Sequence, residues 1–137
     1  MKEREDIVKE QPNGRETILI AEDEPSLLTY LTRVLEPLGY KLLTTANGRE
    51  AISTSKAYND DIHLLLTDVI MPGIDGRELS EKLCKDRPGM KVVYMSGYTH
   101  DVIAQHGVLE KGVHFIQKPV SLNKLTHAIR SVLDEKI

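Results

Sequence analysis

One stretch decides the fold of this chain: Leu64-Leu65-Leu66-Thr67-Asp68-Val69-Ile70-Met71-Pro72-Gly73. The apolar run that leads into it begins at Ile62 and is interrupted only by His63. It ends on Asp68, and the turn residues Pro72 and Gly73 follow. A short apolar run that ends at chain-breaking residues is typical of a strand buried on both faces of a parallel sheet. Asp68 would then lie at the carboxyl end of a central strand, where ligands and chemistry collect in open α/β sheets.

The rest of the chain alternates between strand and helix patterns. Strands are predicted over 17–21, 41–46, the opening stretch, 91–95 and 113–117, and helices over 27–38, 49–58, 75–86, 100–106 and from Ser121 onward. Such alternation predicts an α/β fold, with a five-stranded parallel sheet doubly wound by helices on both faces. Residues 1–16 are polar and charged, and we expect them to form a flexible leader before a single domain over 17–137.

Composition excludes several classes of function. A length of 137 residues with 40% hydrophobic content suits one domain with a real core. The net charge of −3 is too small to predict binding of nucleic acid, and with no Trp and one Phe the chain lacks an aromatic platform for bases. The single cysteine, Cys84, rules out an internal disulfide and fits a reducing compartment. No signal peptide and no apolar run of about 18 residues is present, so we expect a cytoplasmic protein without membrane insertion.

Polar side chains follow four of the predicted strands. Glu22 and Asp23 follow the first strand, Asp68 the third, Ser96 the fourth and Lys118 the fifth. Each alone has an ordinary explanation, as an acid cluster at a helix start, a turn cap, a turn hydroxyl or a solvated loop charge. Because the carboxyl ends of parallel strands meet at one edge, their joint placement instead predicts a site.

The residue types at this edge point to phosphoryl chemistry. Three carboxylates at close range resist joint ionisation, and a hard divalent cation such as Mg²⁺ relieves that repulsion through oxygen ligands. With the metal in place, Asp68 can act as a nucleophile toward phosphorus and form an acyl phosphate. Lys118 and the Ser96 hydroxyl would offset charge on the phosphoryl oxygens.

Four motifs in this order resemble the receiver domains of response regulators in two-component signalling. They are Ile18-Leu19-Ile20-Ala21-Glu22-Asp23-Glu24-Pro25, Thr67-Asp68-Val69-Ile70-Met71-Pro72-Gly73-Ile74-Asp75-Gly76, Met95-Ser96-Gly97-Tyr98 and Gln117-Lys118-Pro119-Val120. The resemblance covers roughly residues 16–135, and each motif alone would be weak. It implies a CheY-like, flavodoxin-like (βα)5 fold with strand order 2-1-3-4-5.

The resemblance also implies a role for each acid. Asp68 would be the phosphoacceptor. Asp23 would bind Mg²⁺ directly and Glu22 through water, together with Asp68 and the backbone carbonyl of Ile70. A receiver domain is a phosphoacceptor rather than an enzyme, apart from self-phosphotransfer and autodephosphorylation.

The switch residues come from the last two motifs and the strand between them. Ser96 would be the switch hydroxyl, and Lys118 would pair with the phosphoryl oxygens, followed by a cis peptide bond at Pro119. The family's aromatic switch position falls on Phe115, which lacks the hydroxyl of the Tyr found in some members. A ring that turns inward here therefore changes packing without making a hydrogen bond.

Two bulky residues flank the predicted site. Ile70 lies two residues after Asp68, and Tyr98 lies two residues after Ser96. We hypothesise that both tune access by crowding the path of hydrolytic water, which would lengthen the life of the acyl phosphate.

The expected output surface comprises the helix over 100–106, the strand over 113–117 and the last helix. The helix over 100–106 has few apolar residues, and low local stability suits a switching element. The expected partners are a sensor histidine kinase or a histidine phosphotransfer domain, with this surface as a candidate homodimer interface. The leader and the last two motifs resemble the C-terminal receiver of a hybrid sensor kinase, and a stand-alone relay protein is the alternative.

Three other functions remain open at this point. The chain could be a degenerate receiver that binds proteins without phosphorylation. It could be a phosphatase with an Asp nucleophile, although such enzymes carry a second acid where this chain has Ile70. A flavodoxin-like cofactor binder would need a glycine-rich phosphate loop after the first strand, where this chain has three acids.

Overall fold

The computed structural model describes residues 12–97 and 114–135. Within them one parallel sheet contains the strands β1 (Thr17–Ala21), β2 (Lys41–Thr45), β3 (Leu64–Asp68), β4 (Lys91–Ser96) and β5 (His114–Gln117). The strand order is β2-β1-β3-β4-β5, which confirms the predicted order 2-1-3-4-5.

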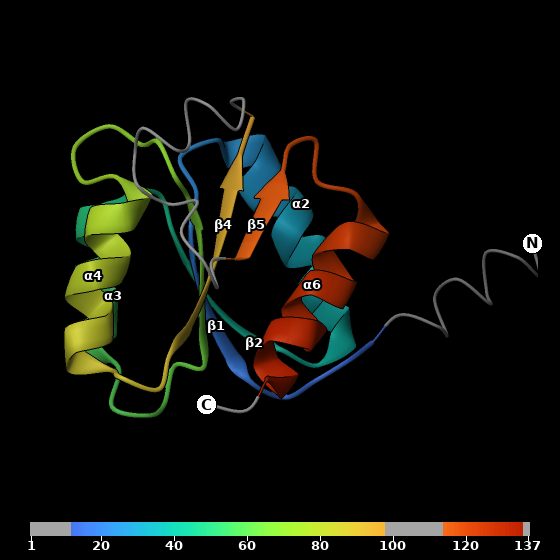
Figure 1. Ribbon diagram of the computed structural model, residues 1–137, viewed down its shortest axis with the longest axis horizontal. Coiled ribbons are helices and arrows are strands. Elements are labelled where there is room, and N and C mark those ends of the chain that lie inside the picture. The colour runs from blue at the N-terminus through green and yellow to red at the C-terminus, as the bar shows by residue number, and fades with distance from the viewer. Residues whose placement is uncertain (1–11, 98–113, 136–137) are drawn as a thin grey trace, which may run out of the picture.

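Strand β3 is central because both of its faces are apolar. Leu64, Leu65 and Leu66 are each 0% exposed, and the strand pairs with β1 on one side and β4 on the other. Side chains alternate between the faces of a strand, so Leu65 packs into one core while Leu64 and Leu66 pack into the other. The parallel pairing brings the carboxyl ends of all five described strands to one edge of the sheet (Figure 1).

Helices cover both faces of the sheet. The described ones are α2 (Pro25–Leu35), α3 (Gly48–Ala57), α4 (Gly76–Asp86) and α6 (Leu122–Asp134). Helices α2 and α6 lie on one side, and α3 and α4 lie on the other (Figure 1). The doubly wound α/β architecture predicted from the sequence is therefore confirmed.

Local sequence signals set the helix ends. Side chains of Asn47, Asp75 and Ser121 cap α3, α4 and α6 by accepting a hydrogen bond from a backbone N–H in the first turn. The start predicted for the last helix at Ser121 is thus confirmed. Helix α2 begins at Pro25, and after Leu35 it tightens into the 3₁₀ turn η1 (Glu36–Leu38). The tightening fits Pro37, which has no N–H to continue the α-helical ladder.

The predicted helix over 100–106 lies outside the described residues. So does most of the predicted leader, of which residues 12–16 are described. Gly14 N donates a hydrogen bond to Leu38 O at 3.1 Å, and Arg130 of α6 donates to Asn13 O at 2.9 Å. The end of the leader is therefore attached to the domain. In the described part of the chain, no helix is long and apolar enough to cross a membrane.

Candidate functional site

Three charged side chains meet at the carboxyl edge of the sheet. Lys118 Nζ lies 2.6 Å from Asp68 Oδ1 and 3.3 Å from Glu22 Oε1. Asp68 is 3% exposed and Glu22 is 1% exposed, so both carboxyl groups are nearly cut off from solvent. The ammonium of Lys118 therefore sits between two buried carboxylates that come from different strand ends.

Hydrogen bonds orient the Glu22 carboxyl group and the backbone that carries Asp68. Glu22 N donates to Thr45 O at 3.1 Å, which ties the end of β1 to the end of β2. Glu22 Oε2 accepts a hydrogen bond from Glu24 N at 2.9 Å, so the other oxygen turns toward Lys118. The Thr67 hydroxyl donates to Asp68 O at 3.0 Å at the end of β3. These contacts fix the backbone at the ends of β1 and β3, from which the two carboxyl groups project.

The carboxylates are electrostatically unsatisfied. Burial and the neighbouring Glu22 carboxyl raise the pKa of Asp68 well above its ordinary value, and the Lys118 ammonium opposes that rise. Burial alone would lower the pKa of Lys118, but the Asp68 and Glu22 carboxylates outweigh it and keep the ammonium charged. One ammonium does not compensate two buried carboxylates, so the site favours additional positive charge.

The same residues fit a hard divalent cation. Glu22, Asp23 and Asp68 each offer a carboxylate oxygen, and these oxygens lie within 4.8 Å of one another. Among the described side chains, Asp68 Oδ2 is a buried oxygen with no hydrogen-bond partner, and the contact of Glu22 Oε1 with Lys118 is an ion pair without hydrogen-bond geometry. Asp23 is exposed, which leaves one side of the group open to water. A group of carboxylate oxygens with one side open to water is the kind of donor set that Mg²⁺ prefers.

The other predicted site residues lie around this group. Ser96 is buried at 3% exposure at the end of β4, and Lys118 N donates to Ser96 O at 2.8 Å. Phe115 of β5 and Ile70, in the loop after Asp68, are half-buried. Both pack against a small apolar cluster formed by Val69 and Tyr94. The Lys118–Pro119 peptide bond is cis, as the resemblance implies. Tyr98 lies outside the described residues.

The sequence did not predict that Gly76 packs against the backbone of Asp68. A Cβ atom added to Gly76 would lie 2.0 Å from Asp68 O, and Gly76 N donates to Val69 O at 2.7 Å. The first turn of α4 therefore rests directly on the backbone of Asp68. The available signal was a glycine at a helix start, directly after the capping Asp75, where glycine is otherwise a poor choice.

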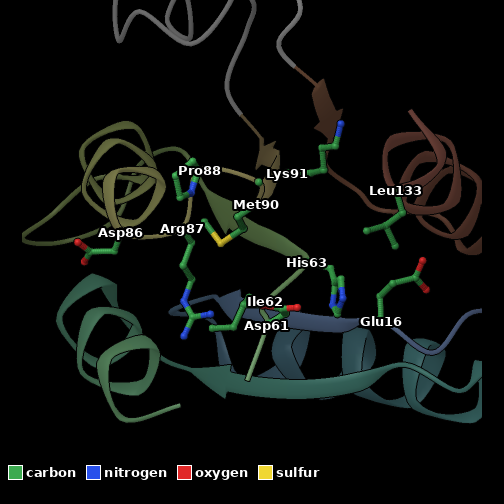
Figure 2. A pocket seen from close by; sticks show the side chains of 11 residues that line it. Glu16, Asp61, Ile62, His63, Asp86, Arg87, Pro88, Met90, Lys91 and Leu133 are labelled. Carbon is green, nitrogen blue, oxygen red and sulfur yellow. The ribbon is translucent and has the colours of Figure 1, made fainter. Parts of the chain in front are cut away.

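Two cavities lie in different parts of the described structure. One, of about 590 Å³, opens beside Lys118 and is also lined by Tyr30 and Pro119. The other, of about 470 Å³, lies at the opposite edge of the sheet, near the residues that precede β1, β3 and β4 (Figure 2). None of the predicted site residues lines this second cavity. The predicted chemistry is therefore concentrated at the carboxyl edge.

Comparison with known proteins places this geometry in a family. Residues 18–130 match the family model described as the response regulator receiver domain. The sensor kinase CckA of Brucella abortus (strain 2308) is 30% identical over 124 residues, which are 90% of this chain and 13% of the kinase. The response regulator receiver protein CpdR of the same organism is 28% identical over 116 residues, covering 85% of this chain and 95% of CpdR.

A solved structure supports the same assignment. The CheY-like receiver domain protein of Methanospirillum hungatei JF-1 superimposes with a TM-score of 0.77 at 30% identity. The match covers 88% of this chain and 95% of that one. The relatives thus include one protein of about this length and one far longer kinase, of which this chain matches a small part.

Proposed function

The chain belongs to the response regulator receiver domain family, and from this premise we propose that it takes a phosphoryl group onto Asp68. The donor would be the phosphohistidine of a sensor histidine kinase or of a histidine phosphotransfer domain. Asp68 carries the proposal, because it is a buried carboxylate at a strand end with Oδ1 held by Lys118 and Oδ2 without a partner among the described residues.

The transfer would be a direct displacement at phosphorus. An oxygen of the Asp68 carboxylate attacks, an O–P bond forms, the P–N bond to the donor imidazole breaks, and the imidazole nitrogen takes up a proton. Lys118 would stay beside Asp68 and offset charge on the phosphoryl oxygens. Because the domain is the acceptor, its only catalysis would be this self-phosphotransfer and later autodephosphorylation.

Magnesium fits the remaining ligands of the site. Asp23 and Asp68 would bind the ion through carboxylate oxygens, Glu22 through water, and Ile70 through its backbone carbonyl. When bound, Mg²⁺ neutralises charge on the phosphoryl oxygens. The unpartnered Asp68 Oδ2, the single ammonium shared by Glu22 and Asp68, and the raised pKa of Asp68 support this assignment, because they mark a site with too little positive charge.

Phosphorylation would then switch a surface. A phosphoryl group adds about −1.5 to −2 charges and three acceptor oxygens. The Ser96 hydroxyl would move toward it, and Phe115 would follow inward. The output or dimer surface would be formed by residues 100–106, β5 and α6, of which the first lies outside the described residues.

The lifetime of the acyl phosphate is a separate part of the proposal. Ile70 and Tyr98 would crowd the path of the hydrolytic water. Replacing both with small polar residues should shorten the lifetime, and an unchanged rate of dephosphorylation would contradict their role.

The relatives support two kinds of protein in which this domain would work. We propose a cytoplasmic domain, as a stand-alone relay or as the receiver of a hybrid kinase. The sensor kinase relative supports the second setting and CpdR the first. The competing function is a degenerate receiver that binds partners without phosphorylation.

A metal-dependence experiment tests the proposal. Acetyl phosphate serves as a small donor, and the Mg²⁺ concentration that gives half-maximal phosphorylation is measured on phosphate-affinity gels. Asp23→Asn should raise that concentration at least about tenfold. Asp61→Asn is the matched control, because Asp61 is an exposed acid beside the opposite cavity, and it should behave as the wild type. Equal behaviour of the two variants would contradict the metal assignment.

A further inference from the structure

Tyr94 connects β4 to α4 inside the molecule. It lies two residues before Ser96 on β4 and is 7% exposed. Its hydroxyl oxygen lies 2.6 Å from Ser80 Oγ, and Ser80 lies on the buried face of α4. No motif singled out this pair in the sequence.

The direction of this hydrogen bond follows from the single hydrogen of the Ser80 hydroxyl. Ser80 Oγ donates to Arg77 O at 2.9 Å, so Tyr94 is the donor to Ser80 Oγ. Burial raises the pKa of Tyr94, and the phenol therefore stays protonated at the pH of any ordinary assay. The contact is a buried hydrogen bond of fixed direction.

Helix α4 is in turn fixed to the phosphoacceptor. Its first residue, Gly76, donates to Val69 O at 2.7 Å and leaves no space for a Cβ atom beside Asp68 O. A shift of the end of β4 toward Asp68 is therefore a shift relative to α4. Such a shift has to stretch the bond between Tyr94 and Ser80 or turn the Tyr94 ring.

Tyr94 also adjoins the predicted aromatic switch. It pairs in register with Phe115 on β5, which places both side chains on the same face of the sheet. Phe115 packs against the cluster that Tyr94 forms with Val69. The space toward which Phe115 would turn is thus bordered by a ring that Ser80 holds in place.

We propose that Tyr94 is a positioning residue that restrains the switch, holding the end of β4 and Phe115 in the resting arrangement through its hydrogen bond to Ser80. This rests on the proposed function, since it restrains the movement that phosphorylation of Asp68 would drive. Loss of the hydrogen bond lowers the cost of that movement. The activated arrangement is then easier to reach.

Beryllofluoride with Mg²⁺ tests the proposal, because it mimics a phosphoryl group on a carboxylate and is not consumed. Tyr94→Phe removes only the donor hydroxyl, and Ser80→Ala removes the acceptor. Each variant should reach half-saturation at a beryllofluoride concentration about threefold to tenfold lower than the wild type, as expected for loss of one buried hydrogen bond from the resting state alone. Thr32→Val is the control, because it removes another hydroxyl that donates to a backbone carbonyl, Leu28 O within α2, outside the proposed output surface. It should reduce stability and leave the affinity unchanged.

A second readout follows Phe115 itself. Phe115 is the only phenylalanine in the chain, so 4-fluorophenylalanine gives one ¹⁹F signal in the wild type and in Ser80→Ala. Without ligand, the signal of Ser80→Ala should lie closer to the beryllofluoride-saturated position than that of the wild type. An unmoved signal with unchanged or weaker affinity in both variants would overturn the restraint. A wild-type protein that binds no beryllofluoride would contradict the proposed function, and the restraint with it.

Discussion

At the scale of single residues, Gly76 leaves the least room for change, because the first turn of α4 rests on the backbone of Asp68. The polar residues at four strand ends were readable from the alternation of elements, and the structure brings Glu22, Asp68 and Lys118 into contact. The closeness of Gly76 to Asp68 O was not readable. A glycine in this position is equally typical of a turn, and only the packing of α4 on the end of β3 removes the space for a side chain.

Gly76→Ala should therefore be costly. The added Cβ would meet Asp68 O at 2.0 Å, and a backbone atom cannot give way cheaply. We expect a loss of about 2 kcal/mol or more in the free energy of unfolding, as for overpacked sites. Gly89→Ala is the control, because nothing lies within 4 Å of its added Cβ and its φ is not positive. Urea denaturation that gave equal stability to both variants would contradict the account.

At the scale of elements, capping residues were the most informative local signal. Ser121 was predicted to start the last helix and does so, since its side chain accepts a hydrogen bond from Lys124 N. After the strand over 41–46, the sequence predicts a helix over 49–58, and the structure begins α3 at Gly48 with Asn47 as its cap. Element bounds were less readable, because the apolar spacing over 27–38 continues through Pro37, where the structure replaces the α-helix by the 3₁₀ turn η1.

Asn47→Ala tests the cap of α3. Asn47 Oδ1 accepts from Glu50 N at 2.9 Å, and Glu50 Oε1 accepts in return from Ala46 N at 3.1 Å. Loss of this reciprocal cap should lower the free energy of unfolding by about 1 kcal/mol. Asn47→Ser keeps a capping acceptor without placing a second carboxylate against Glu50, whose Oε2 accepts from Asn47 Nδ2 at 3.2 Å, and should retain most of the stability. If the two variants melted alike in thermal denaturation, the cap would not be the cause.

At the scale of the whole molecule, the alternation of strand and helix patterns predicts the sheet. It does not predict that the residues before β1 contact the last helix, α6. Arg130 of α6 donates to Glu16 Oε2 at 2.6 Å, to Asn13 O at 2.9 Å and to Asp134 Oδ1 at 2.8 Å. Residues 13 and 130 lie far apart in the sequence, and a leader of polar residues has no periodicity that would place it on a helix. Only the three-dimensional structure shows this set of contacts of Arg130 with Asn13, Glu16 and Asp134, which we call the Arg130 clasp.

The clasp predicts a pH dependence of stability. The hydrogen bond from Arg130 lowers the pKa of Glu16 from its ordinary 4.5 to about 2. A lowered pKa in the folded state means that the stabilisation is complete above pH 4.5 and is lost as the pH falls toward 2. The difference in unfolding free energy between wild type and Glu16→Gln should therefore shrink over that range.

Arg130→Gln provides the matched background for this measurement. Without the guanidinium, Glu16→Gln should have little further effect at any pH, as in a double-mutant cycle for one interaction. Urea denaturation at several pH values between 2 and 7 measures both series. A wild-type advantage that did not change with pH would show that the clasp is not electrostatic.

The central claim is that Asp68 accepts a phosphoryl group, and intact mass spectrometry tests it most directly. Wild-type protein and Asp68→Asn are incubated with acetyl phosphate, each with and without Mg²⁺. The account predicts a gain of one phosphoryl group in the wild type, only with Mg²⁺, and no gain in Asp68→Asn. No gain in a wild-type protein that is folded would contradict the account and favour a receiver that works as an unphosphorylated binding module.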